Sequence, residues 1–270
     1  MIELFDKEMQ MPERKSSKGN QLKWERENIW YKADYTGYEG LSEYIVSKLL
    51  KLSNIPEEMF TEYETEQILY KKQLYLGCSS RNFLKDGWKL LTLERLFFQQ
   101  CGESLYQSIF HIQGIKERAK FLVEQTESMT GLTHFGEYLW MLLTVDALFL
   151  NEDRHTHNIA ILQEPSGVFH YSPIFDNGAS LLSDTTMDYP LGEDNIYDLI
   201  DTVTSKTLCE DFREQLEAVE DLYGQKLIFS YDNRVLNELL KLEKYYPQEE
   251  KKRVITILLE QKRKYSYLFS

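Results

Sequence analysis

Cysteine is scarce in this 270-residue chain, and no cysteine motif is present. Only Cys78, Cys101 and Cys209 occur, and no two of them have C-x-x-C spacing. An odd number of cysteines without such spacing argues against a disulfide framework and predicts reduced thiols. The first ten residues, MIELFDKEMQ, also lack the apolar region of a secretory signal peptide. Together these absences predict a cytoplasmic protein.

Long apolar runs and a surplus of positive charge are absent as well. The most apolar stretch, residues 138–150, is too short to span a bilayer and contains Asp146. Lys and Arg number 31 against 44 Asp and Glu, which gives a formal net charge of −13. An acidic chain of this kind has no large surface for nucleic-acid phosphates. We therefore expect neither direct nucleic-acid binding nor a membrane partner, and any anionic ligand has to meet locally placed cations.

Two common site motifs are missing or incomplete. The Walker A sequence, G-x-x-x-x-G-K-[ST], does not occur, so a P-loop nucleotide site of that type is excluded. His155 and His157 are two residues apart, whereas helical zinc sites use a pair four residues apart, with further ligands nearby. A zinc site on these histidines remains an alternative interpretation.

Hydrophobic residues make up 42% of the chain and aromatic residues 13%, which is enough for a sizeable core. Apolar periodicity predicts a strand over 27–35, a helix over 41–52 and one or two strands over 67–77. Beyond residue 78 the pattern is mainly helical, with one hairpin; the expected elements are helices 91–102, 115–131 and 134–151, a hairpin over 158–176, and helices after 191. We expect an α+β fold with a β-rich N-lobe, residues 1–77, and a larger helical C-lobe, residues 78–270.

Residues 151–163, NEDRHTHNIAILQ, concentrate polar side chains directly before an apolar strand. Asp153 and Asn158 have the D-x-x-x-x-N spacing of a kinase catalytic loop. In that loop the aspartate accepts the proton of the substrate hydroxyl and the asparagine holds magnesium. A second metal aspartate is expected after a short hairpin in a D-x-G context, and Asp176 with Gly178 supplies it. The hairpin is expected to bring Asp176 beside Asn158.

A kinase also needs a cation for the α- and β-phosphates and a loop that covers the triphosphate. Lys32 lies on the predicted strand 27–35, and Glu43 on the next helix can orient it as an ion pair. The predicted phosphate loop lies upstream of that strand and comprises Ser16, Ser17, Lys18, Gly19, Asn20 and Gln21. Each of these features alone is common in proteins, but their order along the chain favours phosphoryl transfer.

Two stretches, LFLNEDRHTHNIAIL and YSPIFDNGASLL, carry a resemblance to a known family. They resemble the N-x-D-R-H-x-x-N and P-x-[FY]-D signatures of HipA-like serine/threonine kinases. The match is densest over 146–182 and looser over 16–45. The resemblance implies a bilobal protein-kinase-like fold, ATP and magnesium as cofactors, and phosphorylation of a serine or threonine in a protein.

The same resemblance implies roles for individual residues. Asp153 is the catalytic base, Asn158 and Asp176 are the metal ligands, and Lys32 binds phosphate. His155 is then a structural member of the catalytic loop. Family members are often autophosphorylated on a serine of the phosphate loop, where this chain has Ser16 and Ser17.

Full-length HipA toxins carry an additional N-terminal subdomain, whereas fifteen residues precede the predicted phosphate loop here. The chain is therefore more similar to compact, CtkA-like members, and an antitoxin partner is one expectation from the family. Two other functions remain open. The D-R-H-x-x-N string also occurs in phosphatidylinositol kinases, so the chain can be a lipid or small-molecule kinase. It can also be a nucleotide-binding pseudokinase that acts by docking a partner.

Overall fold

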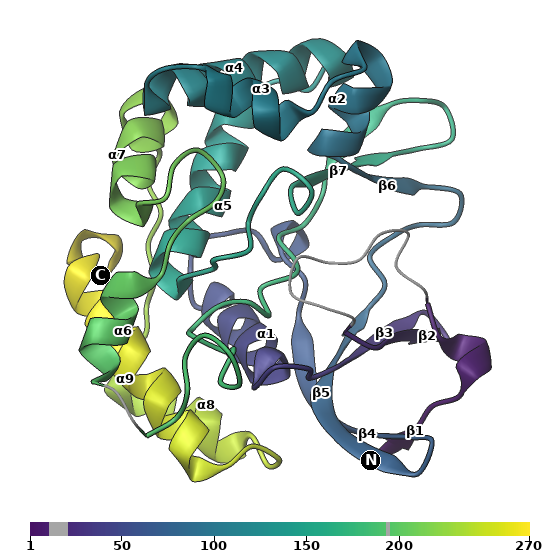
Figure 1. The fold of residues 1–270 in the computed structure, drawn as a ribbon, viewed down its shortest axis with the longest axis vertical. Coiled ribbons are helices and arrows are strands. Elements are labelled where there is room, and N and C mark those ends of the chain that lie inside the picture. Colours follow the sequence, from purple (N-terminus) through teal and green to yellow (C-terminus); the bar gives the residue numbers. More distant parts are fainter. Residues whose placement is uncertain (11–20, 193–194) are drawn as a thin grey trace. The chain divides into compact units, whose positions relative to one another are not determined.

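The computed structural model describes residues 1–10, 21–192 and 195–270 (Figure 1). They contain both helices and sheets, as the sequence predicts for an α+β protein. The chain divides into two compact units. Unit 1 comprises residues 1–83, 175–203 and 228–270, and unit 2 comprises residues 84–174 and 204–227. These units group the chain differently from the two predicted lobes, whose boundary after residue 77 stays a prediction.

Unit 1 is built on a five-stranded sheet with the strand order β1-β4-β5-β3-β2. Its strands are β1 (Ile2–Glu3), β2 (Lys23–Arg26), β3 (Ile29–Ala33), β4 (Tyr63–Tyr70) and β5 (Gln73–Arg81). The predicted strand region 67–77 falls within two strands, because Lys71 and Lys72 both adopt positive φ angles and turn the chain between β4 and β5. β1 pairs with β4 in parallel, and the other pairs are antiparallel.

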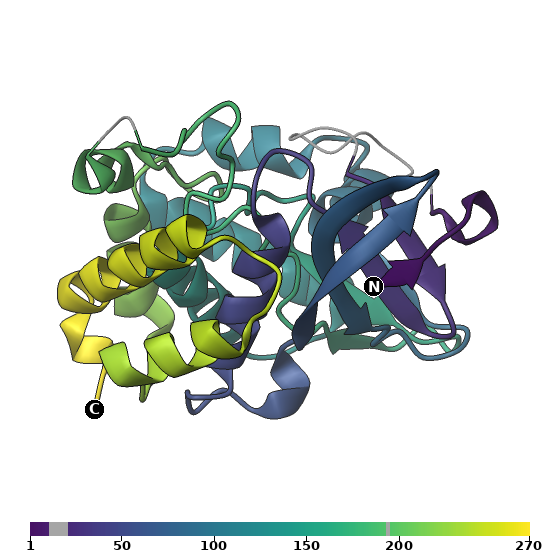
Figure 2. The ribbon, with the colours of Figure 1, turned by 90° about the horizontal axis from the view of Figure 1, so that it is seen from below.

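The helices of unit 1 come from both ends of the chain. They are α1 (Glu39–Leu50), α6 (Ile196–Thr202), α8 (Asn233–Leu242) and α9 (Gln248–Lys264), with short 3-10 turns at Asp6–Glu8, Glu57–Met59 and Ser266–Leu268. α1 packs against β4 and β5 and also contacts α8, and α8 and α9 lie side by side (Figure 2). Ten of the twelve residues of α1 are buried. A helix buried on nearly all sides forces its polar residues to find partners inside the protein.

Unit 2 combines five helices with a three-stranded antiparallel sheet of order β6-β7-β8, among the residues described. Its elements are β6 (Lys89–Thr92), α2 (Leu93–Cys101), α3 (Leu105–His111), α4 (Ile115–Thr130), α5 (Phe135–Phe149), β7 (Ala160–Gln163), β8 (Phe169–Tyr171) and α7 (Phe212–Tyr223). α5 packs against α4 and α7, and thirteen of its fifteen residues are buried (Figure 1). The most apolar helix is thus the core helix of its unit, as its composition predicts. In the described ranges, no helix combines the length and apolarity needed to cross a membrane.

Candidate active site

Lys32 lies in the middle of the unit 1 sheet, where β3 pairs with both β2 and β5. Its Cα partner on β5 is Cys78. The lysine is buried, and its Nζ lies 5.1 Å from the centre of the Tyr63 ring. Burying an ammonium costs free energy unless it is paired and hydrogen-bonded. Lys32 Nζ therefore needs partners inside the protein.

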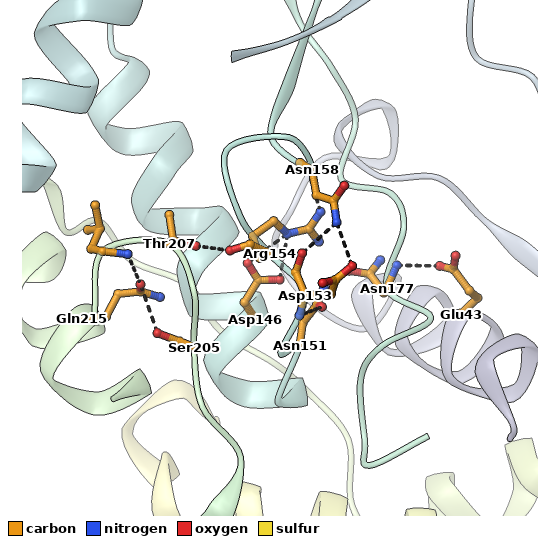
Figure 3. Close-up of polar contacts among 11 residues, drawn as sticks. Glu43, Asp146, Asn151, Asp153, Arg154, Asn158, Asn177, Ser205, Thr207 and Gln215 are labelled. Carbon is orange, nitrogen blue, oxygen red and sulfur yellow. Dashed lines mark hydrogen bonds and ion pairs between the residues drawn. The ribbon is translucent and has the colours of Figure 1, made fainter. Parts of the chain in front are cut away.

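Two carboxylates meet this ammonium. Lys32 Nζ donates to Glu43 Oε1 at 2.6 Å and to Asp176 Oδ1 at 2.7 Å. Glu43 comes from α1, and its second oxygen accepts the backbone N–H of Asn177 at 2.8 Å (Figure 3). The ion pair expected between Lys32 and Glu43 is therefore present, and Asp176 joins it. Lys32 and Glu43, 11 positions apart, form one charged cluster with the distant Asp176 within unit 1.

The charges of this cluster do not balance, because one ammonium faces two carboxyl groups. Burial acts to lower the pKa of Lys32, but Asp176 and Glu43 raise that pKa well above its ordinary value. Burial also raises the pKa of Glu43, against the opposing effect of Lys32. Lys32 is thus charged across the physiological pH range. The side chain of Asp176 is 31% exposed, so its carboxylate is within reach of a ligand from solvent.

The backbone around Asp176 is held in an unusual conformation. Asp176, Leu181 and Leu182 have positive φ angles of 60°, 58° and 56°. Residues other than glycine rarely adopt such angles, and where they do, the surrounding structure must enforce them. Here both leucines are buried. The strained segment begins at Asp176, one residue before the Asn177 N–H that bonds Glu43.

Hydrogen bonds attach this segment to the start of α1. Tyr38 donates its hydroxyl to Leu181 O at 2.6 Å, and Ser42 donates to Ser180 O at 3.0 Å. Thr185 donates its backbone N–H to Thr36 O at 3.0 Å. The segment that carries Asp176 and the helix that carries Glu43 are therefore bonded to each other at several points beyond the charged cluster.

In unit 2, the loop that follows α5 is held by a buried ion pair. Arg154 Nε lies 3.0 Å from Asp146 Oδ2, and the exposed fractions of these side chains are 3% and 1%. Arg154 also donates to the backbone oxygen of Asn158 at 3.1 Å. The buried arginine thus ties the Asn158 end of the D-x-x-x-x-N stretch to Asp146 of α5 (Figure 3). In the sequence, the only signal for this partner is that Asp146 is the single carboxylate of the apolar stretch 138–150.

Asp153 and Asn158 contact each other within this loop (Figure 3). Asn158 Nδ2 donates to Asp153 O at 2.7 Å and to Asp153 Oδ2 at 3.1 Å. Both partners can only accept, so the amide nitrogen must face Asp153. These two bonds use the N–H groups of the amide. The amide oxygen, Oδ1, is therefore the atom of Asn158 that can bind a metal ion. A hard amide oxygen of this kind suits magnesium.

The two histidines of the loop have different surroundings. Burial lowers the pKa of His155, although Asp153 acts in the opposite direction. His157 is exposed, and the two rings are nearly perpendicular with centroids 5.4 Å apart. Within the described parts of the chain, no group of three or more His, Cys, Asp or Glu residues could hold a metal ion. The zinc interpretation therefore gains no further ligand among these residues.

The predicted phosphate loop falls mostly outside the described residues. Ser16, Ser17, Lys18, Gly19 and Asn20 belong to the range 11–20, and Gln21, two residues before β2, is half-buried. The predicted roles of all these residues stay predictions. The remaining site residues form two groups, with Lys32, Glu43 and Asp176 in unit 1 and Asp153 and Asn158 in unit 2. The expected approach of Asp176 to Asn158 also stays a prediction.

The element order and the sheets define a kinase-like α+β fold, and a solved structure is similar to it. The crystal structure of a Helicobacter pylori proinflammatory kinase, CtkA, matches with a TM-score of 0.55 and 16% sequence identity. The match covers 97% of this chain and 94% of that chain. The predicted fold class is therefore confirmed, while membership of the HipA-like family stays a prediction. No protein-family model matches the chain, and no curated protein matches its sequence.

Proposed function

We propose that the chain is a kinase that uses ATP and magnesium to phosphorylate a serine or threonine of a protein. The observation that carries the proposal is the contact of Lys32 Nζ with both Glu43 and Asp176 at 2.6 and 2.7 Å. The sequence had assigned these three residues to one nucleotide site from their order alone. A kinase requires such a lysine, held by a glutamate and lying next to a metal-binding aspartate.

The donor groups fit the proposed cofactors. Asp176 offers a partly exposed carboxylate and Asn158 an amide oxygen, and magnesium prefers hard oxygen ligands such as these. When bound, magnesium neutralises charge on the phosphates and orients them for in-line transfer. Lys32 would then hold the α- and β-phosphates, and Glu43 would keep the ammonium in place.

Asp153 is proposed to accept the proton of the attacking hydroxyl. The hydroxyl oxygen forms a bond to the γ-phosphorus while the bond from that phosphorus to the β,γ-bridging oxygen breaks. ADP leaves with the electron pair, and the hydroxyl proton moves to Asp153. Asn158 holds the Asp153 carboxylate at 3.1 Å, so the base is oriented before a substrate arrives.

A screen with labelled ATP tests the function and separates the alternatives. The chain is incubated with Mg-ATP and protein, lipid or sugar acceptors, beside a Lys32→Met variant and a reaction containing a chelator. We expect labelled phosphoserine or phosphothreonine on protein, lost in the variant and with chelator. Label on lipid or sugar alone would instead identify a lipid or small-molecule kinase. Nucleotide binding without transfer to any acceptor would identify a pseudokinase.

Autophosphorylation and a toxin role are further parts of the proposal. Mass spectrometry after incubation with Mg-ATP is expected to find phosphate on Ser16 or Ser17. A phosphate there adds about −1.5 to −2 charge beside the phosphates of ATP and should inhibit. Active enzyme without phosphate on this peptide would contradict the autophosphorylation proposal. A toxin should arrest growth when expressed, and its Asp153→Asn variant should not; growth arrest by both would contradict a role through phosphorylation.

A further inference from the structure

A lysine far from the catalytic motif lies beside the proposed base. Lys206 Nζ is 3.6 Å from Asp153 Oδ1, and both residues belong to unit 2. The side chain of Lys206 is 38% exposed and that of Asp153 is 14% exposed. The distance exceeds the range of a normal N–H···O hydrogen bond. The ammonium is therefore close to the base without being locked to it.

The backbone that carries Lys206 is fixed from both sides. Thr207 donates its hydroxyl to Arg154 O at 2.6 Å, one residue after Asp153 (Figure 3). Gln215 Oε1 accepts the Leu208 N–H at 2.9 Å and the Ser205 hydroxyl at 3.2 Å. The three polar side chains that make these bonds are almost completely buried. Buried hydrogen bonds of this kind specify a single loop conformation, and here that conformation presents Lys206 to Asp153.

The other basic side chains next to Asp153 are an arginine and a histidine. Arg154 is bonded to Asp146 and to the backbone of Asn158. His155 Nε2 lies 3.8 Å from the same Asp153 Oδ1, and its side chain is 19% exposed. Among the described residues of unit 2, Lys206 is thus the ammonium positioned to face a group at Asp153.

Phosphoryl transfer at Asp153 creates a need for such a cation. The attacking hydroxyl must lie within hydrogen-bond reach of the Asp153 carboxylate. In the transfer step this hydroxyl bonds to the γ-phosphoryl group, whose oxygens carry negative charge. The γ-phosphoryl group therefore approaches a carboxylate of the same sign. An ammonium on a flexible four-carbon stem can follow those oxygens.

We propose that Lys206 is a catalytic residue that leaves Asp153 and contacts the γ-phosphoryl oxygens during transfer. This inference rests on the proposed kinase function. Lys206 keeps its protons throughout, while the hydroxyl proton goes to Asp153 and ADP leaves with the electron pair of the broken bond. Before nucleotide binds, the same ammonium neutralises Asp153. The residue thus supplies charge where the phosphoryl group meets the base.

Three variants of the full chain test this role. Lys206→Met removes the charge, Lys206→Arg keeps it, and Lys120→Met removes the charge of an exposed lysine on α4 of the same unit. We expect Lys206→Met to lower kcat by about 10²–10³-fold, the usual loss for one donor to a developing charge. The thermal midpoint should stay close to that of the wild type. Lys206→Arg should recover at least about tenfold of the lost turnover, and Lys120→Met should match wild type.

Nucleotide binding gives a second readout that requires no turnover. Titration calorimetry compares ADP with a non-hydrolysable ATP analogue, both with magnesium. Lys206→Met should weaken binding of the analogue while leaving ADP binding unchanged, because only the analogue has a γ-phosphate for Lys206 to contact. Equal weakening of both ligands would overturn the proposed contact.

The outcomes separate this inference from the proposed function. Wild-type transfer together with normal kcat in Lys206→Met would overturn the role of Lys206 and leave the kinase intact. A loss of kcat that accompanies a lower thermal midpoint, without relief in Lys206→Arg, would make the residue structural and also overturn the role. A wild-type chain that binds no nucleotide would overturn the proposed function and this inference with it.

Discussion

The two groups of site residues are held in place by contacts of different range along the sequence. In unit 1, Lys32 and Asp176 are 144 positions apart, and ion pairs join them and Glu43. In unit 2, the loop around Asp153 is local, because Asp146 and Arg154 are only 8 positions apart and Arg154 bonds the loop backbone. Ion pairs that include positions far apart in the sequence hold the first group, whereas an ion pair between nearby positions and a bond to the loop backbone hold the second. Substitutions in the unit 1 group should therefore change the binding of metal and nucleotide. In unit 2, a substitution of Asp153 should change catalysis, whereas a substitution of Asp146 should change stability.

The largest effect is expected from Asp176→Asn. The substitution keeps the shape of the side chain but removes the proposed metal-binding charge and one of the two carboxylates on Lys32. Turnover of Mg-ATP should fall below detection. This loss is larger than that from removing a general base, which is typically about 10²–10⁴-fold. Steady-state kinetics and circular dichroism of the variant measure activity and fold together.

Asp198→Asn is the matched control, because Asp198 is an exposed carboxylate on α6 of the same unit. It should leave turnover unchanged. Normal turnover in Asp176→Asn would show that the metal assignment is wrong.

Asp153→Asn should affect catalysis without a comparable effect on nucleotide binding. Loss of the proposed base should lower kcat by about 10²–10⁴-fold. The affinity for ATP should change by less than about tenfold, or about 1.4 kcal/mol, because Lys32 and the proposed metal ligands remain. Kinetics and titration calorimetry measure the two quantities separately.

His157→Ala tests the zinc alternative beside that variant. The exposed imidazole has no ligand role in the kinase proposal, so its loss should be mild. Bound zinc in the purified protein, combined with an inactive His157→Ala variant, would reverse this ranking and refute the kinase assignment.

Asp146→Ala should reduce stability rather than remove a reacting group. It removes the carboxylate paired with the buried Arg154, and breaking a buried ion pair typically costs about 3–5 kcal/mol. Urea unfolding of the full chain measures the change. The control is Glu238→Ala, which removes an exposed pair with Arg234 and should cost less than about 1 kcal/mol. Equal effects of the two substitutions would contradict the structural role assigned to the buried pair.

The smallest effect concerns Glu250 on α9, another carboxylate of unit 1. Burial, together with Glu249 and Glu243, raises the pKa of Glu250 to about 7. The native state therefore keeps the Glu250 carboxyl group protonated to a higher pH than the unfolded chain does. The contribution of this protonated group to stability is lost as pH rises from about 4.5 to 7. Glu250→Gln should remove that loss.

The expected gain is about 1 kcal/mol at pH 8, after allowance for the half-exposed position of the carboxyl group. At pH 4 the variant and wild type should be equally stable. Urea unfolding at both pH values measures the difference, and Glu238→Gln on α8 serves as an exposed control. A gain of the same size at both pH values would rule out titration as the cause.

The parts of the site that could be predicted from the sequence are those whose chemistry fixes a spacing. Asp153 and Asn158 had to be five residues apart, and Lys32 had to precede Glu43 by a strand-to-helix step. The same holds for the apolar helix α5, whose burial follows from composition. The kinase-like α+β fold followed from the order of these elements.

Other features depend on tertiary contacts that no spacing reveals. Lys206 reaches Asp153 only because Thr207 and Gln215 hold its loop, and nothing in the string SKTL marks that position. The short strand β1 is defined by its parallel partner β4 rather than by a periodic pattern of its own. Asp146 carried a weak signal as the only carboxylate of the apolar stretch 138–150, but its pairing with Arg154 is seen only in the folded chain.

The pairing of Cys78 with Lys32 across β5 and β3 has a practical consequence for measuring local motion. The thiol is buried, and burial raises its pKa well above the ordinary value, so a thiol reagent can modify it only when the strand pair opens. Cys101 is exposed and provides a reference for the intrinsic rate. The ratio of the two labelling rates therefore reports the free energy of local opening beside Lys32, with native residues as the only probes.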